Sequence, residues 1–256
     1  MLYKKTPYYK IYKGDCLDLI KKLPKQSVDM VFADPPYNLS NDGITCKSGR
    51  IASVNKGDWD KSKGLKLDYQ FTKKWLKLIK RVLTPQGTVW ISGTYHNIYY
   101  IAFALAELDY AIINDIAWFK PNAAPNMSCR CFTASHETLL WAKKNKKAKH
   151  YFDYNLVKKI NDGKQMRSVW KIPTTPKSEK KYGNHPTQKP IELLKRCIIS
   201  STNINDTILD PFCGSGTTGV VALLSNRKFI GIEIDPSFVE LTIKRIDNSI
   251  IDGGIK

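Results

Sequence analysis

Hydrophobic residues follow two alternating patterns along the chain. Short apolar runs, typical of buried strands, alternate with segments whose apolar residues recur every three or four positions, as on one face of a helix. The runs predict strands at Tyr9–Lys13, Val28–Ala33, Gly87–Gly93, Ala111–Phe119, Glu137–Lys143, Thr207–Leu209 and Phe229–Ile234. The helical pattern covers Cys16–Leu23, Phe71–Leu83, Asn97–Leu108, Ile191–Ser200, Thr217–Leu224 and Pro236–Asp247. This alternation predicts an α/β fold with a mostly parallel sheet.

Two stretches break this regularity. Asn38–Leu67 is rich in Gly, Ser, Asn and Lys, and we expect it to form a long loop. Between Lys143 and Lys189, the basic run "KKNKKAKH" precedes a segment that several prolines interrupt. This second stretch is either a solvated surface excursion or an insertion that reads the substrate.

The charge of the chain narrows the choice of partner. The 256 residues include 41 Lys and Arg but only 23 Asp and Glu, which gives a net charge of +18. Such a surplus favours a polyanionic partner, because phosphate contacts release counterions. The 42% hydrophobic content is enough for a sizeable core, so general disorder is not expected. Nucleic acid is the partner that the charge favours.

The cysteines and the apolar runs exclude other classes of protein. The six cysteines form no Cys-x-x-Cys pair, so a zinc site is not expected and no metal is predicted. Scattered cysteines without an apolar leader indicate reduced thiols in a cytoplasm. The longest apolar run, Ile98–Ala106, is too short to cross a bilayer, so no membrane is expected.

A glycine-rich loop lies between a predicted strand and a predicted helix. Gly214, Gly216 and Gly219 satisfy the pattern G-x-G-x-x-G, which lets a ligand approach the backbone at a helix start. Glu233 ends the next strand, where a carboxylate can bind ribose hydroxyls. The acid before the loop, Asp210, suits a ligand with a positively charged amine. A P-loop is excluded, and a dinucleotide dehydrogenase is a competitor that does not explain Asp210.

The tetrapeptide Asp34-Pro35-Pro36-Tyr37 directly follows a predicted strand. If the ligand is S-adenosylmethionine, its methyl group is already electrophilic, and the nucleophile needs help. Asp34 and the Pro35 carbonyl can accept hydrogen bonds from the amino group of a base, and Tyr37 can stack on a base rotated out of the duplex. The chain has no Pro-Cys pair for methylation at a ring carbon, and it lacks the signature of a zinc deaminase.

At this point the chain resembles the beta-class amino-group DNA methyltransferases, adenine-N6 type, with likeness to the second methylases of DpnII-type systems and to HinfI-type methylases. The likeness extends over nearly the whole sequence. It includes "KGDCLDLIKKL", "DPPYNLSNDGI", "KGDWDK", "GTVWISGTYHNIY", "FKPNAAPN", "SHETLLWA" and "HPTQKP". In that family the catalytic tetrapeptide precedes the cofactor loop, as it does here.

The resemblance implies a doubly wound, mostly parallel, seven-stranded Rossmann-like methyltransferase sheet. Residues 1–256 would form one circularly permuted catalytic domain, with a catalytic half at 1–142 and a cofactor half at 189–248. Residues 120–188 would be a target-recognition insertion. The expected location is the bacterial cytoplasm, the partner is double- or single-stranded DNA, and a homodimer is an open alternative.

The resemblance also implies a set of residues for S-adenosylmethionine. The set is Asp15, Cys16, Asp34, Lys189, Asp210, Phe212, Gly214, Gly216, Thr217 and Glu233. Asp15 and Cys16 would lie near the adenine, Glu233 at the ribose and Lys189 near the carboxylate. Asp34 would also face the methionine amine. Cys213 occupies a position that is usually aromatic or glycine in the family, which leaves the cofactor interpretation unchanged.

Candidate DNA contacts lie in the irregular stretches and are Lys56, Asn122, Asn126, Arg130, Lys143 and Lys144. Asn and Arg side chains can read base edges, and lysines contact phosphates. His136 and His185 are expected to be structural, because this chemistry needs no histidine base.

The predicted function is transfer of a methyl group from S-adenosylmethionine to adenine N6 in DNA, in a restriction–modification system and with GATC as target. Three alternatives stay open at this point. They are methylation of cytosine N4 by the same kind of site, a GANTC-specific adenine methylase, and a basic DNA-binding module without catalysis.

Overall fold

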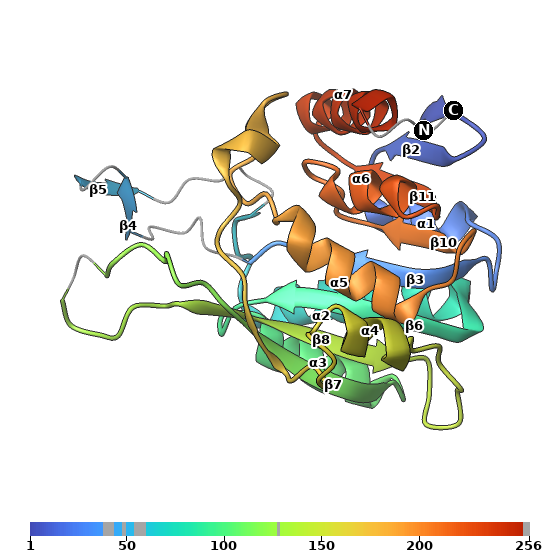
Figure 1. The fold of residues 1–256 in the computed structure, drawn as a ribbon, viewed down its shortest axis with the longest axis horizontal. Coiled ribbons are helices and arrows are strands. Elements are labelled where there is room, and N and C mark those ends of the chain that lie inside the picture. Colours follow the sequence, from blue (N-terminus) through green and yellow to red (C-terminus); the bar gives the residue numbers. More distant parts are fainter. Residues whose placement is uncertain (38–43, 48–49, 54–59, 127–128, 253–256) are drawn as a thin grey trace.

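In the computed structural model, which describes residues 1–37, 44–47, 50–53, 60–126 and 129–252, a nine-stranded sheet forms the centre of the fold (Figure 1). From edge to edge its strands are β1 (Leu2–Lys5), β2 (Tyr9–Lys13), β11 (Lys228–Glu233), β10 (Thr207–Asp210), β3 (Val28–Ala33), β6 (Leu83–Gly93), β8 (His136–Lys143), β7 (Ala111–Phe119) and β9 (Val169–Lys171). Only β1 and β8 run antiparallel to their neighbours in this sheet.

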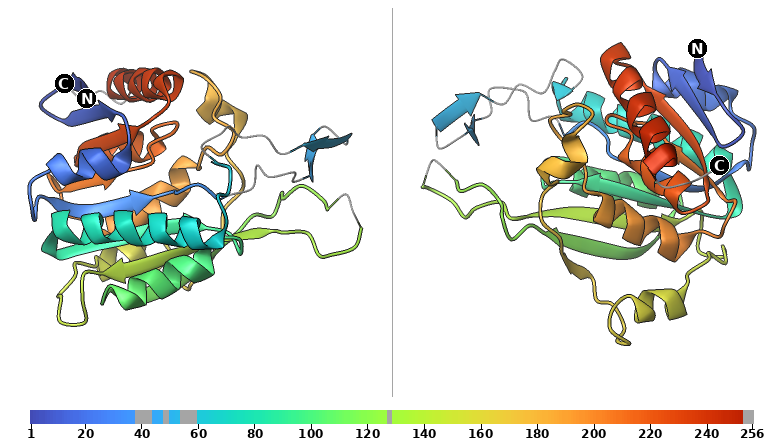
Figure 2. Two further views of the ribbon diagram at one scale, coloured as in Figure 1. Left: turned by 180° about the vertical axis from the view of Figure 1, so that it is seen from behind. Right: turned by 45° about the horizontal axis from the view of Figure 1, so that its top comes forward.

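Helices cover both faces of the sheet (Figures 1 and 2). One face carries α1 (Cys16–Lys22), α2 (Leu65–Val82) and α3 (Ile98–Glu107). The other carries α4 (Tyr154–Lys159), α5 (Ile191–Ser201), α6 (Thr217–Leu224) and α7 (Pro236–Asp252). Within the described ranges, no helix combines the length and the apolar character needed to span a membrane. The predicted α/β, doubly wound class is confirmed.

The sheet has nine strands in the described part of the chain, so the predicted number of seven was wrong. The two additional strands extend the edges: β1 pairs with β2 on one side, and β9 pairs with β7 on the other. Both are short, and most of their residues are exposed. Neither has the continuous apolar run that marks a buried strand.

The middle parts of the central strands are mostly apolar because both of their faces are buried. In β6, Val89 and Ile91 face one hydrophobic cluster with Trp75 of α2, while Trp90 between them faces the other. There Trp90 stacks on Trp141 of β8, with ring centroids 4.9 Å apart and an angle of 7° between the planes. These two layers fix the strand register and therefore the positions of the strand ends.

The chain changes direction across the sheet between β10 and β3. These strands are parallel neighbours, but β3 leads through α2 to β6 on one side, while β10 leads through α6 to β11 on the other. In open α/β sheets, ligands bind beyond the carboxyl ends of strands at such a switch point. The predicted tetrapeptide follows β3 and the glycine loop follows β10, so both lie at this crevice.

Two segments extend from the same side of the molecule (Figures 1 and 2). One is the hairpin of β4 (Ile44–Lys47) and β5 (Arg50–Ser53), and the other is the loop between β7 and β8. The prediction of a loop over Asn38–Leu67 was therefore partly wrong, since it contains this hairpin and the start of α2. The range 120–188 contains β8, a strand inside the sheet, so it holds two separate excursions, one before β8 and one after it.

Candidate functional site

A cavity of about 330 Å³ lies at the switch point. Its walls come from the tetrapeptide after β3, the glycine loop, the end of β11, the start of α1 and one side of α2. All of the residues predicted for catalysis or for the cofactor line this cavity, except Gly216. The fold thus brings together residues that are as far apart in sequence as Asp15 and Glu233.

The backbone of the tetrapeptide is held by two buried polar side chains. The Tyr37 N–H donates to Asp60 Oδ1 at 2.8 Å, and Asn97 Nδ2 donates to the Pro36 carbonyl at 3.3 Å. Both residues are only 1% exposed. Our sequence reasoning missed them, although they lie in the segments "KGDWDK" and "GTVWISGTYHNIY" that carry the family likeness. They fix the direction of the peptide groups around Pro35 and Pro36.

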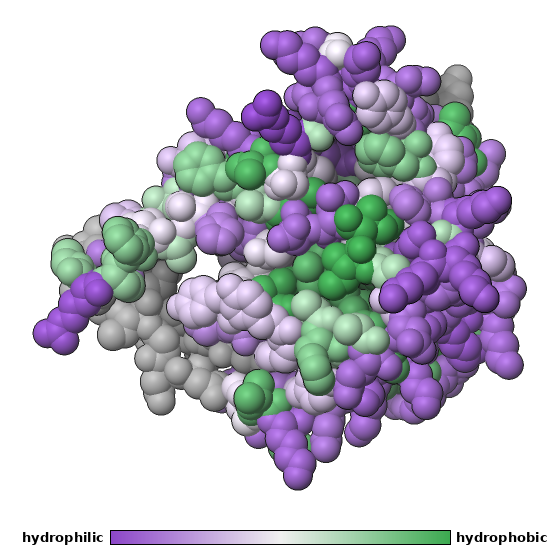
Figure 3. Space-filling view, turned by 90° about the horizontal axis from the view of Figure 1, so that it is seen from below, coloured by the Kyte–Doolittle hydropathy of each residue, from purple (hydrophilic) through white to green (hydrophobic). Residues whose placement is uncertain are grey.

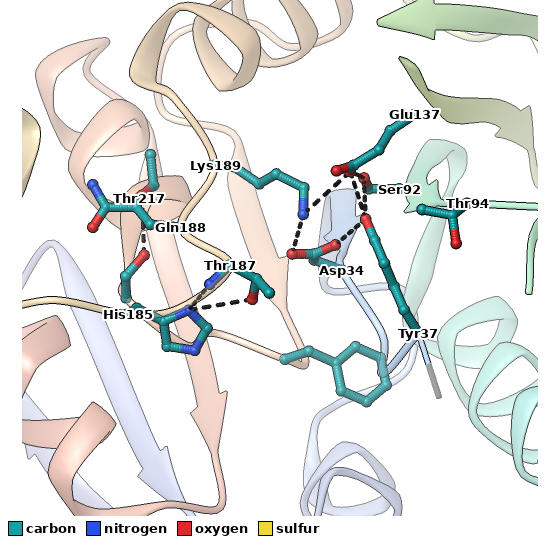
Figure 4. A network of polar contacts seen from close by, with 12 residues as sticks. Asp34, Tyr37, Ser92, Thr94, Glu137, His185, Thr187, Gln188, Lys189 and Thr217 are labelled. Carbon is teal, nitrogen blue, oxygen red and sulfur yellow. Dashed lines mark hydrogen bonds and ion pairs between the residues drawn. The ribbon is translucent and has the colours of Figure 1, made fainter. Parts of the chain in front are cut away.

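Asp34 is occupied by two donors (Figure 4). Its Oδ1 accepts from the Tyr37 hydroxyl at 2.8 Å, and its Oδ2 pairs with Lys189 Nζ at 2.6 Å. Burial raises the pKa of Asp34, and the Lys189 ammonium opposes this rise. Lys189 also lies over the Tyr37 ring, 5.0 Å from its centroid. We predicted that Lys189 lies near the carboxylate of S-adenosylmethionine, and the structure pairs it with Asp34.

Glu137, at the start of β8, completes this polar network. Its Oε2 lies 2.8 Å from the Tyr37 hydroxyl oxygen, and its Oε1 pairs with Lys120 Nζ at 2.5 Å. Ser92 Oγ lies 2.8 Å from the Tyr37 oxygen. Burial alone would raise the pKa of Glu137, but Lys189 and Lys120 outweigh it and lower the pKa to about 2. The sequence did not single out Glu137, Lys120 or Ser92.

The glycine loop is shaped by packing as well as by backbone conformation. Gly214 and Gly216 have φ values of 51° and 74°, in the left-handed region that favours glycine. A Cβ on Gly216, the N-cap of α6, would lie 2.8 Å from a methyl carbon of Thr242, and one on Gly214 would lie 3.0 Å from His185 Nε2. These glycines therefore make room for neighbouring side chains, which is a different reason from the ligand contact that we predicted.

Two further carboxylates face the cavity. Asp210 accepts from the Phe212 N–H at 3.0 Å and from the Thr218 hydroxyl at 2.5 Å. Burial raises its pKa to about 7. Glu233 accepts from the Gly214 N–H at 2.6 Å, and burial also raises its pKa. These acids are held in place by the loop that they border.

The other predicted cofactor residues form the rim and floor of the cavity. Asp15 caps α1 by accepting from the Leu17 N–H at 2.6 Å, and Cys16 beside it is 8% exposed. The Phe212 ring packs edge-on against Trp75, with centroids 5.6 Å apart. Thr217 is buried at the start of α6. Carboxylates and an aromatic ring therefore surround one partly apolar space.

Comparison with known proteins places the chain in a family. Residues 28–244 match the family described as DNA methylase. The chain belongs to the DNA methylase family. It is 51% identical over 247 residues to the type II methyltransferase M2.DpnII of Streptococcus pneumoniae, covering 94% of this chain and 92% of that protein. It is 49% identical over 237 residues to M2.MboI of Moraxella bovis, covering 93% and 87%.

Solved structures have the same architecture. The crystal structure of the M1.HpyAVI–SAM complex matches with a TM-score of 0.68 and 30% identity, covering 93% of this methylase and 99% of that chain. The cytosine-N4-specific PvuII DNA methyltransferase matches with a TM-score of 0.74 at 21% identity, covering 97% and 92%, which is a likeness of fold. The resemblance expected from the sequence is therefore confirmed.

Three of the predicted DNA contacts of this methylase lie in the β7–β8 loop. Asn122 exchanges hydrogen bonds of 3.0 Å with the side chain and the N–H of Thr174. Asn126 donates to the Cys131 sulfur at 3.0 Å, and Arg130 is exposed. Near Arg130, Phe132 is fully exposed, and sequence reasoning missed it. Lys56 lies outside the described residues.

The other two predicted DNA contacts lie far from the site. Because β8 runs antiparallel to β6, Glu137 is at the cavity while Lys143 is at the opposite end of the sheet, beside Thr88. Lys143 donates to the Ala148 carbonyl at 3.0 Å, and Lys144 donates to the Leu83 carbonyl at 2.6 Å. These contacts favour a structural role for both lysines, and their predicted binding to DNA stays a prediction.

Proposed function

We propose that this DNA methylase transfers the methyl group of S-adenosylmethionine to the N6 amino group of adenine in DNA, within a restriction–modification system and at GATC sites. The observation that carries the proposal is the position of Asp34. Its carboxylate lies at the end of the cavity, on a backbone that Asp60 and Asn97 hold, with Lys189 at 2.6 Å.

The cavity residues fit S-adenosylmethionine by their chemistry. When bound, this molecule supplies a methyl group on a positively charged sulfur. Asp210 offers a buried carboxylate for its amino group, and Glu233 offers one for its ribose hydroxyls. Phe212 and the apolar side of α2 border the remaining space. The M1.HpyAVI structure, a related protein at 30% identity, was solved as a complex with this cofactor.

The amino group of adenine is a weak nucleophile because its lone pair is delocalised into the ring. Asp34 and the Pro35 carbonyl accept its two N–H bonds, which localises the lone pair and stabilises the positive charge that develops on nitrogen. The Lys189 ammonium, 2.6 Å from Asp34 Oδ2, favours the ionised form of that carboxyl and opposes the rise in its pKa that burial causes. The two prolines and their buried anchors hold both acceptors in a fixed direction.

The target base leaves the duplex to reach this cavity. The Tyr37 ring, at the cavity wall, stacks on the extruded base. The β7–β8 loop stands beside the crevice (Figures 1 and 2). The face of the molecule in Figure 3 is largely hydrophilic around a central hydrophobic area. Arg130 reads a base edge, and Phe132 is an apolar side chain of the kind that enters a disturbed base stack. The net charge of +18 supports binding to phosphates.

The test combines product analysis with one substitution. DNA treated with the purified protein and cofactor is digested to nucleosides, and mass spectrometry separates N6-methyladenine from N4-methylcytosine. Base-resolution sequencing then gives the target sequence. Asp34→Asn is expected to lower methyl transfer about a hundredfold or more while DNA affinity is retained. Asp109→Asn, at an exposed position after α3, is the matched control. Full activity of Asp34→Asn would exclude the proposed chemistry. N4-methylcytosine as the methylated product would exclude adenine as the target base.

A further inference from the structure

Glu137 is a second acceptor for both groups that occupy Asp34 (Figure 4). The Tyr37 oxygen lies 2.8 Å from Asp34 Oδ1 and also 2.8 Å from Glu137 Oε2. Lys189 Nζ lies 2.6 Å from Asp34 Oδ2 and 3.5 Å from Glu137 Oε2. Each donor that holds the catalytic carboxylate thus has an alternative partner within reach.

The Tyr37 hydroxyl has only one proton for these two carboxylates. An ionised carboxylate accepts hydrogen bonds but does not donate them, so Tyr37 donates either to Asp34 or to Glu137. The Ser92 hydroxyl can form a hydrogen bond in either arrangement. It can donate to the Tyr37 oxygen at 2.8 Å, or to Glu137 Oε2 at 3.3 Å when Tyr37 donates to Asp34. The same heavy-atom positions therefore support two hydrogen-bond patterns.

Other contacts hold Glu137 ready for this exchange. Its Oε1 is fixed by Lys120, which leaves Oε2 directed at Tyr37. Its low pKa, about 2, makes it an ionised acceptor throughout the neutral range. If Asp34 is to accept a hydrogen bond from the substrate amine through Oδ1, the Tyr37 hydroxyl has to release that oxygen.

We propose that Glu137 is a positioning residue for methyl transfer: it accepts the hydrogen bond of the Tyr37 hydroxyl when Asp34 Oδ1 turns to the substrate amine. The inference rests on the proposed function. The exchange frees the catalytic oxygen without leaving the buried hydroxyl of Tyr37 unpaired, and the ring stays in place beside the base.

A double-mutant cycle with Tyr37→Phe tests the proposal. Single-turnover methylation of a duplex is measured at saturating cofactor and DNA for the wild type, Glu137→Gln, Tyr37→Phe and the double variant. A neutral amide competes poorly with Asp34 for the Tyr37 proton. Glu137→Gln should therefore lower the rate constant about tenfold, with apparent affinities for DNA and cofactor unchanged within about twofold. In the Tyr37→Phe background, where there is no hydroxyl to transfer, the same substitution should change the rate less than about twofold.

The surface provides a matched control. Glu107 also accepts from a tyrosine, Tyr69, and pairs with a lysine, Lys73, but none of these three residues lines the cavity, so Glu107→Gln should leave the rate unchanged. If Glu137→Gln fails to fold, Ser92→Ala replaces it in the same cycle, because Ser92 supports the alternative pattern.

The outcomes separate the two levels of inference. If Glu137→Gln lowers the rate constant equally in both backgrounds, or not at all, the positioning role is overturned. The proposed function is still supported in that case, provided that the wild type methylates DNA. Absence of transfer by the wild type overturns the proposed function and this inference together.

Discussion

The buried carboxyl of Asp210 is predicted to lower the stability of the ligand-free protein at neutral pH. Burial raises its pKa from the ordinary 3.8 to about 7, although Thr218 and the Phe212 N–H favour the ionised form. The folded protein therefore binds this proton more tightly than the unfolded chain does. The stabilisation that protonated Asp210 provides is full below pH 3.8, declines as the pH rises towards 7, and is lost above it.

The expected magnitude follows from the pKa difference. At about 1.4 kcal/mol per pKa unit, the whole change from 3.8 to about 7 corresponds to about 4 kcal/mol. About 3 kcal/mol of this stabilisation is lost between pH 5 and pH 8. Asp210→Asn removes the titration, but it replaces one acceptor oxygen by a donor and loses about 1 kcal/mol of hydrogen bonding. At pH 8 the variant should be more stable than the wild type by about 2 to 3 kcal/mol.

The assay is urea-induced unfolding of both proteins without cofactor at pH 5 and at pH 8. Other titrating carboxyls contribute to both proteins, so the difference between the two unfolding free energies isolates Asp210. Asp18→Asn, an exposed substitution on α1, is the matched control and should show no such change. A difference between Asp210→Asn and wild type that is the same at both pH values would refute the reasoning.

The same residue links pH to cofactor affinity. If ionised Asp210 binds the amino group of S-adenosylmethionine, affinity falls as the pH drops below about 7. The dissociation constant of the wild type at pH 6 should be about tenfold higher than at pH 8, and Asp210→Asn should bind weakly at both. Calorimetric titration measures this directly, and a pH-independent wild-type affinity would contradict it.

Further predictions concern packing and DNA binding. Gly219→Ala should lower the free energy of unfolding by about 1 to 3 kcal/mol, because its Cβ would lie 2.6 Å from the Phe229 ring; a stabilised variant in urea titration would contradict this. Replacing Lys146 and Lys147 by Gln should leave the salt dependence of DNA affinity unchanged, since they follow the end of β8 that is remote from the cavity; a flatter dependence in fluorescence anisotropy would show that they contact phosphates. Asn122→Ala should raise the KM for DNA more than it lowers kcat, because the β7–β8 loop loses two hydrogen bonds; unchanged steady-state kinetics would argue against the loop as a DNA contact.

Local patterns predicted several regular elements closely. The bounds of β2, β3, β7 and α6 agree with prediction to the residue, because apolar runs and a glycine mark their ends. Helix α2 was predicted to start at Phe71, but it starts at Leu65. Its first turn, Leu65–Asp68, alternates leucines with polar residues and is mostly exposed, so hydrophobic spacing carries no signal there. The edge strands β1 and β9 were missed for a related reason, since few of their side chains are buried.

The cavity itself was predictable because parallel strands end at the same edge of a sheet. Asp34 follows β3 and Asp210 ends β10, so their proximity needs only the assumption that the two strands are parallel. The structure adds packing as a further reason for the glycines. Gly216 was assigned to the cofactor, but the space beside it is taken by Thr242. A glycine pattern indicates that another group packs closely against the backbone. It does not show whether that group is a ligand or a side chain of the protein.

Glu137 shows why the rest of the site was not readable from the sequence. In a parallel strand the last residues reach the catalytic edge. For this reason most of the predicted catalytic and cofactor residues lie at or after the ends of β3, β10 and β11. Strand β8 runs the other way between β6 and β7, so its second residue, Glu137, reaches that edge and its last residue, Lys143, does not. The same reversal explains both positions: Glu137, which the sequence did not single out, lies beside Asp34, and Lys143, a predicted DNA contact, lies at the opposite end of the sheet. The direction of a single strand therefore decides which of its charged residues contributes to the chemistry.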